Sequence, residues 1–289
     1  MPNILDLRRR IRSVRNTRQI TRAMKMVAGA RLRRAQERIL RARPYAGAIR
    51  TVLESVAARV DPAQQSAIPL LAVRDVRRVL LVLVTADRGL CGAFNSNLIR
   101  AAHSYLQQHS DVEVSMLAVG RKGYDHFRKR RVPMVGEHVN IFSKLEFSSA
   151  KAIAAQIIEL YSDAKVDAVD FIYNEFKSIM TQRVVVERYL PVPPVKPAEG
   201  QFLVEYIYEQ TPAEIFNLLL PRYVQSQVFR ALLESQAAEL AAKTTAMDSA
   251  TRNASEMIDS LTLYMNRVRQ AAITKEIIEI VSGAAAQEE

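Results

Sequence analysis

The chain has 289 residues, with 41 lysines and arginines against 30 aspartates and glutamates, and its formal net charge is +11. Apolar residues make up 49% of the chain, which excludes a disordered polyelectrolyte, and a single cysteine excludes a disulfide framework or a multi-cysteine metal site within it. The longest uninterrupted apolar run, Val79–Val84, is too short to span a membrane. A charge surplus of this size favours nucleic acid, an anionic membrane surface or an acidic protein as the partner.

The positive charge is concentrated at the N-terminal end. Residues 1–43 contain fourteen basic and two acidic residues, so this segment carries +12, whereas residues 44–289 together carry −1. An arginine-rich, acid-poor start resembles a mitochondrial presequence, but the apolar pattern continues past residue 50 without a boundary, and we favour a mature terminus. Nucleic-acid binding stays an alternative, although the first 44 residues contain no aromatic side chain that could stack on bases.

Residues 3–58 are predicted to form one long helix. Their apolar residues recur mostly at steps of three and four, which is typical of a helix with a narrow apolar seam. The spacing breaks after Val14, and we expect the seam to continue in a shifted phase through Ile20, Met24 and Val27. Such a helix would be roughly 85 Å long at about 1.5 Å per residue.

A second long helix is predicted to begin at Thr211 and to run to the end of the chain. Thr211, Pro212 and Glu214 form a helix start signal, with an N-cap threonine, a first-turn proline and a glutamate at the third position. The expected seam includes Met257, Leu261, Tyr264, Val268 and Ala271. The helix would be about 110 Å long, whereas a compact globule of this size is only about 50 Å across. We therefore expect the two terminal helices to bury their seams against each other as an antiparallel coiled coil.

The middle of the chain changes to short apolar runs separated by amphipathic segments. This alternation of strand and helix patterns predicts a Rossmann-like α/β domain with a largely parallel sheet. The expected strands are 78–85, 112–119, 169–174 and 184–189, and the expected helices are 93–108, 124–129 and 148–164. A proline-rich connector is predicted at 191–200. The predicted domains are an N-terminal coiled-coil helix (1–60), the α/β domain (75–207) and a C-terminal coiled-coil helix (208–289).

Two features of the α/β domain suggest chemistry, but a structural interpretation is preferred for each. The turn 85–92 (TADRGLCG) lies between a strand and a helix, where such domains often hold a phosphate. The dinucleotide fingerprint and the phosphate-loop motif are both absent, so we expect a tight turn in which Asp87 and Arg88 pair locally. Cys91 would need a lowered pKa and a base to act as a nucleophile, and no histidine is placed for that role. A nicotinamide-linked enzyme stays the alternative hypothesis, and no cofactor or metal is predicted.

Four stretches of the chain resemble the gamma subunits of F-type ATP synthases. They are Ile11–Ala35, Thr85–Leu98, Arg222–Gln227 and Ala246–Ala286, and the resemblance covers essentially the whole length. It implies that the coiled coil enters a ring of three alpha and three beta subunits, and that the middle domain binds epsilon and the c-ring. Catalysis would occur on the beta subunits. The chain itself would be a non-catalytic rotor that couples c-ring rotation to sequential changes in the three beta subunits.

The same resemblance implies five rotor–stator contact residues. Met24 and Lys25 match the positions at which the family's N-terminal helix faces an acidic loop of beta. Arg269, Gln270 and Thr274 match positions that hydrogen-bond a beta loop, a role that suits guanidinium and amide groups.

The resemblance also carries expectations about the tip, the location and the regulation of the protein. Val281–Ala286 looks like a small apolar tip that turns in an apolar sleeve. A peripheral position on the cytoplasmic face of a bacterial plasma membrane is expected. Regulation through a cysteine pair, as in the chloroplast form, is not expected, because Cys91 is the only cysteine.

Overall fold

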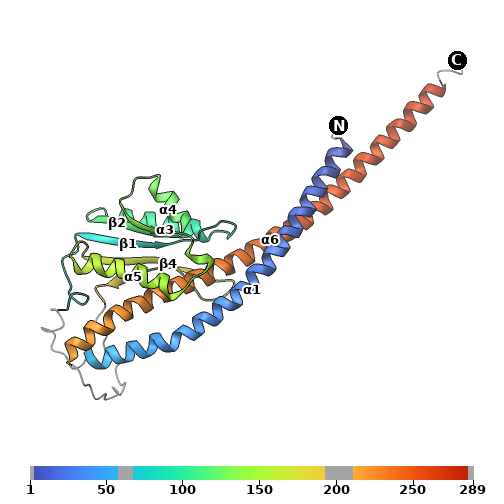
Figure 1. Ribbon diagram of the computed structural model, residues 1–289. Coiled ribbons are helices and arrows are strands. Elements are labelled where there is room, and N and C mark those ends of the chain that lie inside the picture. Colours follow the sequence, from blue (N-terminus) through green and yellow to red (C-terminus); the bar gives the residue numbers. More distant parts are fainter. Residues whose placement is uncertain (1–2, 58–67, 193–210, 286–289) are drawn as a thin grey trace. The chain divides into compact units, whose positions relative to one another are not determined.

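The computed structural model describes residues 3–57, 68–192 and 211–285 (Figure 1). The chain divides into two compact units. The coil unit consists of Met1–Ala28 and Thr244–Glu289, and the sheet unit consists of Gly29–Lys243. Two long helices, α1 (Ile4–Ala57) and α6 (Pro212–Ala285), contribute residues to both units. The predicted connector at 191–200 lies outside the described residues from position 193 onward.

A five-stranded sheet with the order β3-β2-β1-β4-β5 forms the centre of the sheet unit. Its strands are β1 (Arg78–Val84), β2 (Glu113–Val119), β3 (Met134–His138), β4 (Ala168–Phe176) and β5 (Gln182–Leu190). The first four strands pair in parallel and β5 pairs antiparallel with β4. The prediction of a largely parallel sheet is confirmed. The sequence did not predict β3, a short edge strand with a glycine at its centre and no fully buried residue.

Helices cover both faces of this sheet. They are α3 (Phe94–Gln108), α4 (Arg121–Arg128) and α5 (Phe147–Ser162), with a short 3-10 helix η1 (Ile141–Ser143) before α5. Alternate residues of β1 face opposite layers, because side chains alternate along a strand. Val79, Leu81 and Leu83 pack in one cluster with α3 and α4. Leu80, Val82 and Val84 pack in a second cluster with α5 and with the sheet-unit parts of α1 and α6. This burial on both faces explains the continuous apolar run that predicted β1.

A charged network joins three elements of the sheet unit. Asp170 of β4 is buried and accepts hydrogen bonds from Arg188 Nε and Nη2 of β5, at 2.7 and 2.9 Å. The Tyr105 hydroxyl of α3 donates to the same carboxylate. Bidentate pairing of this kind is strong and fixes geometry, so the network ties α3 to the antiparallel edge of the sheet.

The start of α6 has the predicted capping box. The main-chain N–H of Thr211 donates to Glu214 Oε2 at 3.0 Å, and the main-chain N–H of Glu214 donates to Thr211 Oγ1 at 3.4 Å. The helix therefore begins where the sequence pattern placed it.

Candidate functional site

The coil unit is an antiparallel pair of helices held by a regular seam. Along α1 the inward positions recur in alternating steps of four and three, which is the heptad spacing of a coiled coil. The residues at these positions are Leu7, Ile11, Val14, Arg18, Thr21, Lys25 and Ala28, all of them buried or half-buried. On α6 the fully buried seam residues of the coil unit are Met247, Ala254 and Ile258.

The seam contains a polar layer near its middle. Thr21 Oγ1 and Thr251 Oγ1 share a hydrogen bond of 2.8 Å. Lys25 Nζ donates to Asp248 Oδ1 at 2.5 Å, and this contact lowers the pKa of the Asp248 carboxyl. Because the number of the α6 partner falls as the number of the α1 residue rises, the helices are antiparallel. Polar contacts inside a coiled-coil seam fix its register, so these two pairs set how the helices align along their length.

The predicted phase shift after Val14 is wrong. Ile20 and Val27, which the sequence placed in the seam, are 60% and 53% exposed. The heptad instead continues without interruption through polar residues, because Asp248 and Thr251 on α6 provide partners for Lys25 and Thr21. Ile20 and Val27 therefore point outward.

A similar correction applies to α6. Met257 and Tyr264, expected in the seam, are 52% and 44% exposed, whereas Ile258, one residue beyond Met257, is buried. Leu261 and Val268, two other expected seam residues, are half-buried as predicted, so the prediction was wrong at only part of its positions. Apolar residues adjacent to one another on a helix allow either choice, and the facing helix decides between them.

The two predicted contact residues of α1, Met24 and Lys25, have different environments in the structure. Lys25 occupies a seam position and its ammonium group is already paired with Asp248. Met24 is half-buried beside it. The outward apolar surface of α1 also includes Met26, which is 63% exposed and which the sequence analysis did not select. An uninterrupted heptad count would have found Ile20, Met26 and Val27 as outward residues.

Arg269, Gln270 and Thr274 lie where α6 continues past the beginning of α1. The register set by Lys25 and Asp248 puts Ile4, the first residue of α1, opposite about residue 269. From position 269 to position 282 of α6 every residue is exposed except the half-buried alanine at 272. None of these three side chains forms a hydrogen bond or an ion pair with another described residue.

The two predicted contact groups are therefore not brought together. Asp248, the partner of Lys25, and Arg269 are both on α6 and are separated by about 30 Å at about 1.5 Å per residue. They form two separate stations along the coil unit. A partner that contacts both must extend along the helix pair.

An apolar stripe accompanies the polar residues on the unpaired part of α6. Ile273, Ile277, Ile280 and Val281 are 48%, 55%, 71% and 62% exposed. An isolated helix gains little stability in water without packing, and contiguous exposed apolar surface usually marks an interface. Of the predicted tip Val281–Ala286, only the first two side chains are described, and both are exposed.

The turn after β1 is filled by hydrogen bonds within the sheet unit. The main-chain N–H of Ala86 donates to Asn95 Oδ1, and Thr85 Oγ1 accepts from the main-chain N–H of Gly123. Asp87 Oδ1 accepts from two main-chain N–H groups, those of residues 121 and 140, so the expected pairing of Asp87 with Arg88 is wrong. These contacts occupy donors that a phosphate would need, in agreement with the structural interpretation of the turn.

The turn after β1 also packs closely against the loop that follows β2. Gly120 has φ of +94°, and a Cβ atom there would come within 2.0 Å of the Thr85 carbonyl oxygen. The loop after β2 therefore lies directly against the end of β1. This contact requires glycine for both its conformation and its size.

Cys91 lies in a buried position at the start of the α3 region. Burial raises the pKa of its thiol, and its Sγ accepts a hydrogen bond from Asn95 Nδ2 at 3.2 Å. A raised pKa is the opposite of what a nucleophile needs, and the preferred structural role agrees with this environment. Across residues 3–57, 68–192 and 211–285, no three His, Cys, Asp or Glu side chains group as metal ligands. Within those same ranges, no helix has the length and hydropathy to cross a bilayer.

Comparison with known proteins gives consistent matches over the full length. An ATP synthase family model matches residues 3–287. The ATP synthase gamma chain of Solibacter usitatus is 54% identical over 289 residues, which is 100% of both chains. The ATP synthase gamma chain of Geobacter sp. (strain M21) is 49% identical and covers 98% of each chain.

Solved structures match as well. The Tetrahymena thermophila mitochondrial ATP synthase, in its central stalk and c-ring, contains a chain with 29% identity and a TM-score of 0.61, covering 80% of this chain and 99% of that one. A chain of the Euglena gracilis mitochondrial ATP synthase has a TM-score of 0.69 and 21% identity, covering 98% of this chain and 94% of that one. At 21% identity, the second likeness supports the fold alone.

Proposed function

The chain belongs to the ATP synthase gamma chain family, and we propose that it acts as the rotor of the central stalk in a proton-translocating ATP synthase. In this role it couples rotation of the c-ring to sequential conformational change of the three catalytic beta subunits. The observation that carries the proposal is the part of α6 from position 269 to 282, which has almost no packing partner among the described residues. A helix with exposed apolar and hydrogen-bonding side chains is suited to a cavity formed by other subunits.

The asymmetry of the coil unit supports a mechanism for this coupling. The helix pair presents different surfaces in different directions, including the outward residues Ile20 and Val27 on α1 and Tyr264 on α6. As the rotor turns, each beta subunit would meet these surfaces in sequence. A surface that binds one conformation of beta better than another shifts the equilibrium between them, which couples rotation to nucleotide affinity.

We propose that the terminal helices and the middle domain bind different partners. The terminal helices (1–60 and 208–289) enter the ring of alpha and beta subunits, and the middle domain (75–207) binds epsilon and the c-ring. Catalysis then occurs on beta and not on this chain. The chain is a peripheral component at the cytoplasmic face of a bacterial plasma membrane, held there through its partners.

The two stations on the coil unit have different proposed roles. Arg269, Gln270 and Thr274 offer unpaired donors and acceptors, which suit direct hydrogen bonds to a beta loop. Lys25 is already paired with Asp248, so an acidic loop of beta would compete with that carboxylate or share the ammonium group with it. We therefore expect the direct contact at this level to depend on Met24 and its neighbours more than on a free lysine charge.

The proposal is tested with Arg269→Ala and Gln270→Leu in the assembled enzyme. Both side chains are exposed and unpaired within the described chain, so we expect each variant to change the free energy of unfolding by less than about 0.5 kcal/mol. Loss of a charge-assisted hydrogen bond to a partner costs about 1.5–3 kcal/mol, which corresponds to roughly a tenfold or larger fall in the rate of ATP synthesis. The measurement is proton-driven ATP synthesis in membrane vesicles containing the intact complex.

Lys151→Ala is the matched control, because it removes an exposed helical cation from α5 in the sheet unit. We expect it to leave synthesis unchanged. Unchanged synthesis by both α6 variants in a fully assembled complex would contradict the choice of contact residues. Rapid ATP hydrolysis by the purified chain alone would contradict the rotor function itself.

A further inference from the structure

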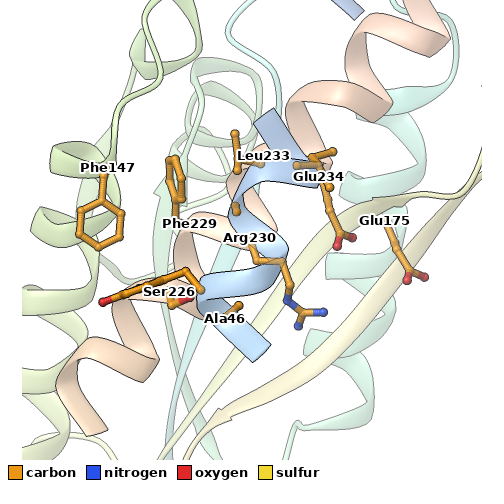
Figure 2. Close-up of a pocket in the computed structure, with 11 residues that line it drawn as sticks. Ala46, Phe147, Glu175, Ser226, Phe229, Arg230, Leu233 and Glu234 are labelled. Atoms are coloured by element: carbon orange, nitrogen blue, oxygen red, sulfur yellow. The ribbon is translucent and has the colours of Figure 1, made fainter. Parts of the chain in front are cut away.

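A cavity of about 560 Å³ lies within the sheet unit and has no part in the proposed contacts with the stator. It is bounded by α1, α6, the first residue of α5 and the end of β4 (Figure 2). Cavities of this size are typical of sites for small molecules.

One side of the cavity is apolar and aromatic. Phe147 and Phe229 meet edge to face, with ring centroids 5.4 Å apart and an interplanar angle of 84°. Figure 2 shows these two rings on the same side, with Leu233 above and Ala46 on the neighbouring helix. Rings in this arrangement leave a face and an edge for a further aromatic group.

The opposite side of the cavity is charged. Figure 2 shows Arg230, Glu234 and Glu175 together, away from the two phenylalanine rings. Arg230 Nη2 donates to both carboxylate oxygens of Glu187, at 3.1 and 3.2 Å. Glu175 forms an ion pair of 2.7 Å with Lys177. Of the charged residues that line the cavity, Glu175 and Glu234 are carboxylates and Arg230 is a cation, so this side has a net negative charge, which disfavours an anionic ligand.

Arg230 also brings hydrogen-bond donors to the cavity. A guanidinium carries five N–H groups, and the Nη2 atom of Arg230 bonds Glu187. The Arg230 side chain lines the cavity and is 36% exposed, so a ligand there can reach the exposed part of the guanidinium. An acceptor oxygen on the ligand can therefore bond Arg230.

We propose that the cavity binds a small neutral amphipathic molecule with an aromatic body and a carbonyl or hydroxyl oxygen at one end. The aromatic body packs against Phe147 and Phe229, and the oxygen accepts a hydrogen bond from the exposed part of the Arg230 guanidinium. Because α1 and α6 both line the site, the bound molecule bridges the two long helices inside the sheet unit. This inference is independent of the proposed rotor function.

The test uses a neutral fluorescent probe with the required chemistry. Prodan has a naphthalene ring, one ketone oxygen and no charge, and its emission shifts to the blue in an apolar site. We expect saturable binding of one molecule per full-length chain with a blue shift. The anionic probe 1-anilinonaphthalene-8-sulfonate has a similar aromatic size, and we expect it to bind at least tenfold more weakly, because its sulfonate meets the carboxylates.

Ala46→Phe fills the cavity and should weaken Prodan binding at least tenfold. Ala48→Phe is the matched control, since it adds the same ring to an exposed position of α1 two residues away that does not line the cavity. Far-UV circular dichroism checks that each variant folds. If Ala46→Phe does not fold, Ala42→Leu narrows the same cavity from the preceding turn of α1.

Three results would each overturn the proposal. The first is the absence of a saturable blue shift with Prodan. The second is equal Prodan affinity in the wild type and in the folded cavity-filling variant, which would place the dye elsewhere. The third is binding of the sulfonate probe as tight as that of Prodan, which would indicate nonspecific association with apolar surface.

Discussion

Replacing Ile11 and Ile20 one at a time by alanine tests the seam of the coil unit. The two residues are of the same type and lie on the same helix, but Ile11 is 6% exposed and Ile20 is 60% exposed. Replacing a buried isoleucine by alanine costs about 2–5 kcal/mol, and the lower part of this range applies to a two-helix seam that can partly close. An exposed replacement costs less than about 0.5 kcal/mol.

Hydrogen–deuterium exchange of the full-length chain measures this difference locally. A loss of about 2 kcal/mol of local stability raises the population of opened states roughly 30-fold, since about 1.4 kcal/mol corresponds to a factor of ten. We expect Ile11→Ala to accelerate exchange by about this factor in α6 around Ile258, and Ile20→Ala to leave it within about twofold. Peptides from β1 in the sheet unit serve as the internal reference.

The reasoning fails if Ile20→Ala accelerates exchange in α6 as much as Ile11→Ala does. That result would mean that the seam follows the shifted phase through Ile20, and that Thr21 and Lys25 are not at seam positions. A uniform acceleration in both units would indicate global unfolding instead, and it would also contradict the local role assigned to Ile11.

Two further predictions concern the charged network of the sheet unit. Asp170→Asn removes the buried carboxylate that binds Arg188 and Tyr105, so we expect a loss of about 2–4 kcal/mol in the free energy of unfolding, measured by denaturant titration. Asp163→Asn, which affects only an exposed pair with Lys165, should cost less than about 0.5 kcal/mol, and equal losses would contradict the role of the network. Burial and the contact with Asp170 raise the pKa of Tyr105 above its ordinary value of 10.0. Its contribution to stability is therefore fully present below pH 10 and is lost as the pH rises further, because the unfolded state releases its proton first. Between pH 9 and pH 11 the wild type should lose more stability than Tyr105→Phe, and parallel pH profiles would show that the hydroxyl has no such effect.

Most of the fold followed from local patterns in the sequence. The apolar run at 78–85 predicted β1, because a strand buried on both faces needs no alternation. The capping residues Thr211 and Glu214 placed the start of α6. The edge strand β3 was missed because it is short, none of its residues is fully buried and its centre is Gly136.

The candidate site was predicted less completely. Arg269, Gln270 and Thr274 are exposed, as a contact role requires, but they were selected only through a family resemblance and not from local spacing. Lys25 came from the same resemblance, and its ion pair with Asp248 was not foreseen. A residue 223 positions away in the chain cannot be identified as a partner from local spacing.

The sequence by itself determined that the two terminal segments are long helices with heptad seams, that the middle is an α/β layer, and that the positive charge is concentrated in the first 43 residues. The charge no longer points to nucleic acid, because the chain belongs to a family of ATP synthase subunits. Only the tertiary structure decided which helical face is buried and where α6 loses its partner. Periodicity determines which residues share a face, but burial depends on the side chains that the facing helix presents. Polar residues on α6 made the polar positions of α1 the buried ones and left Ile20 and Val27 outside.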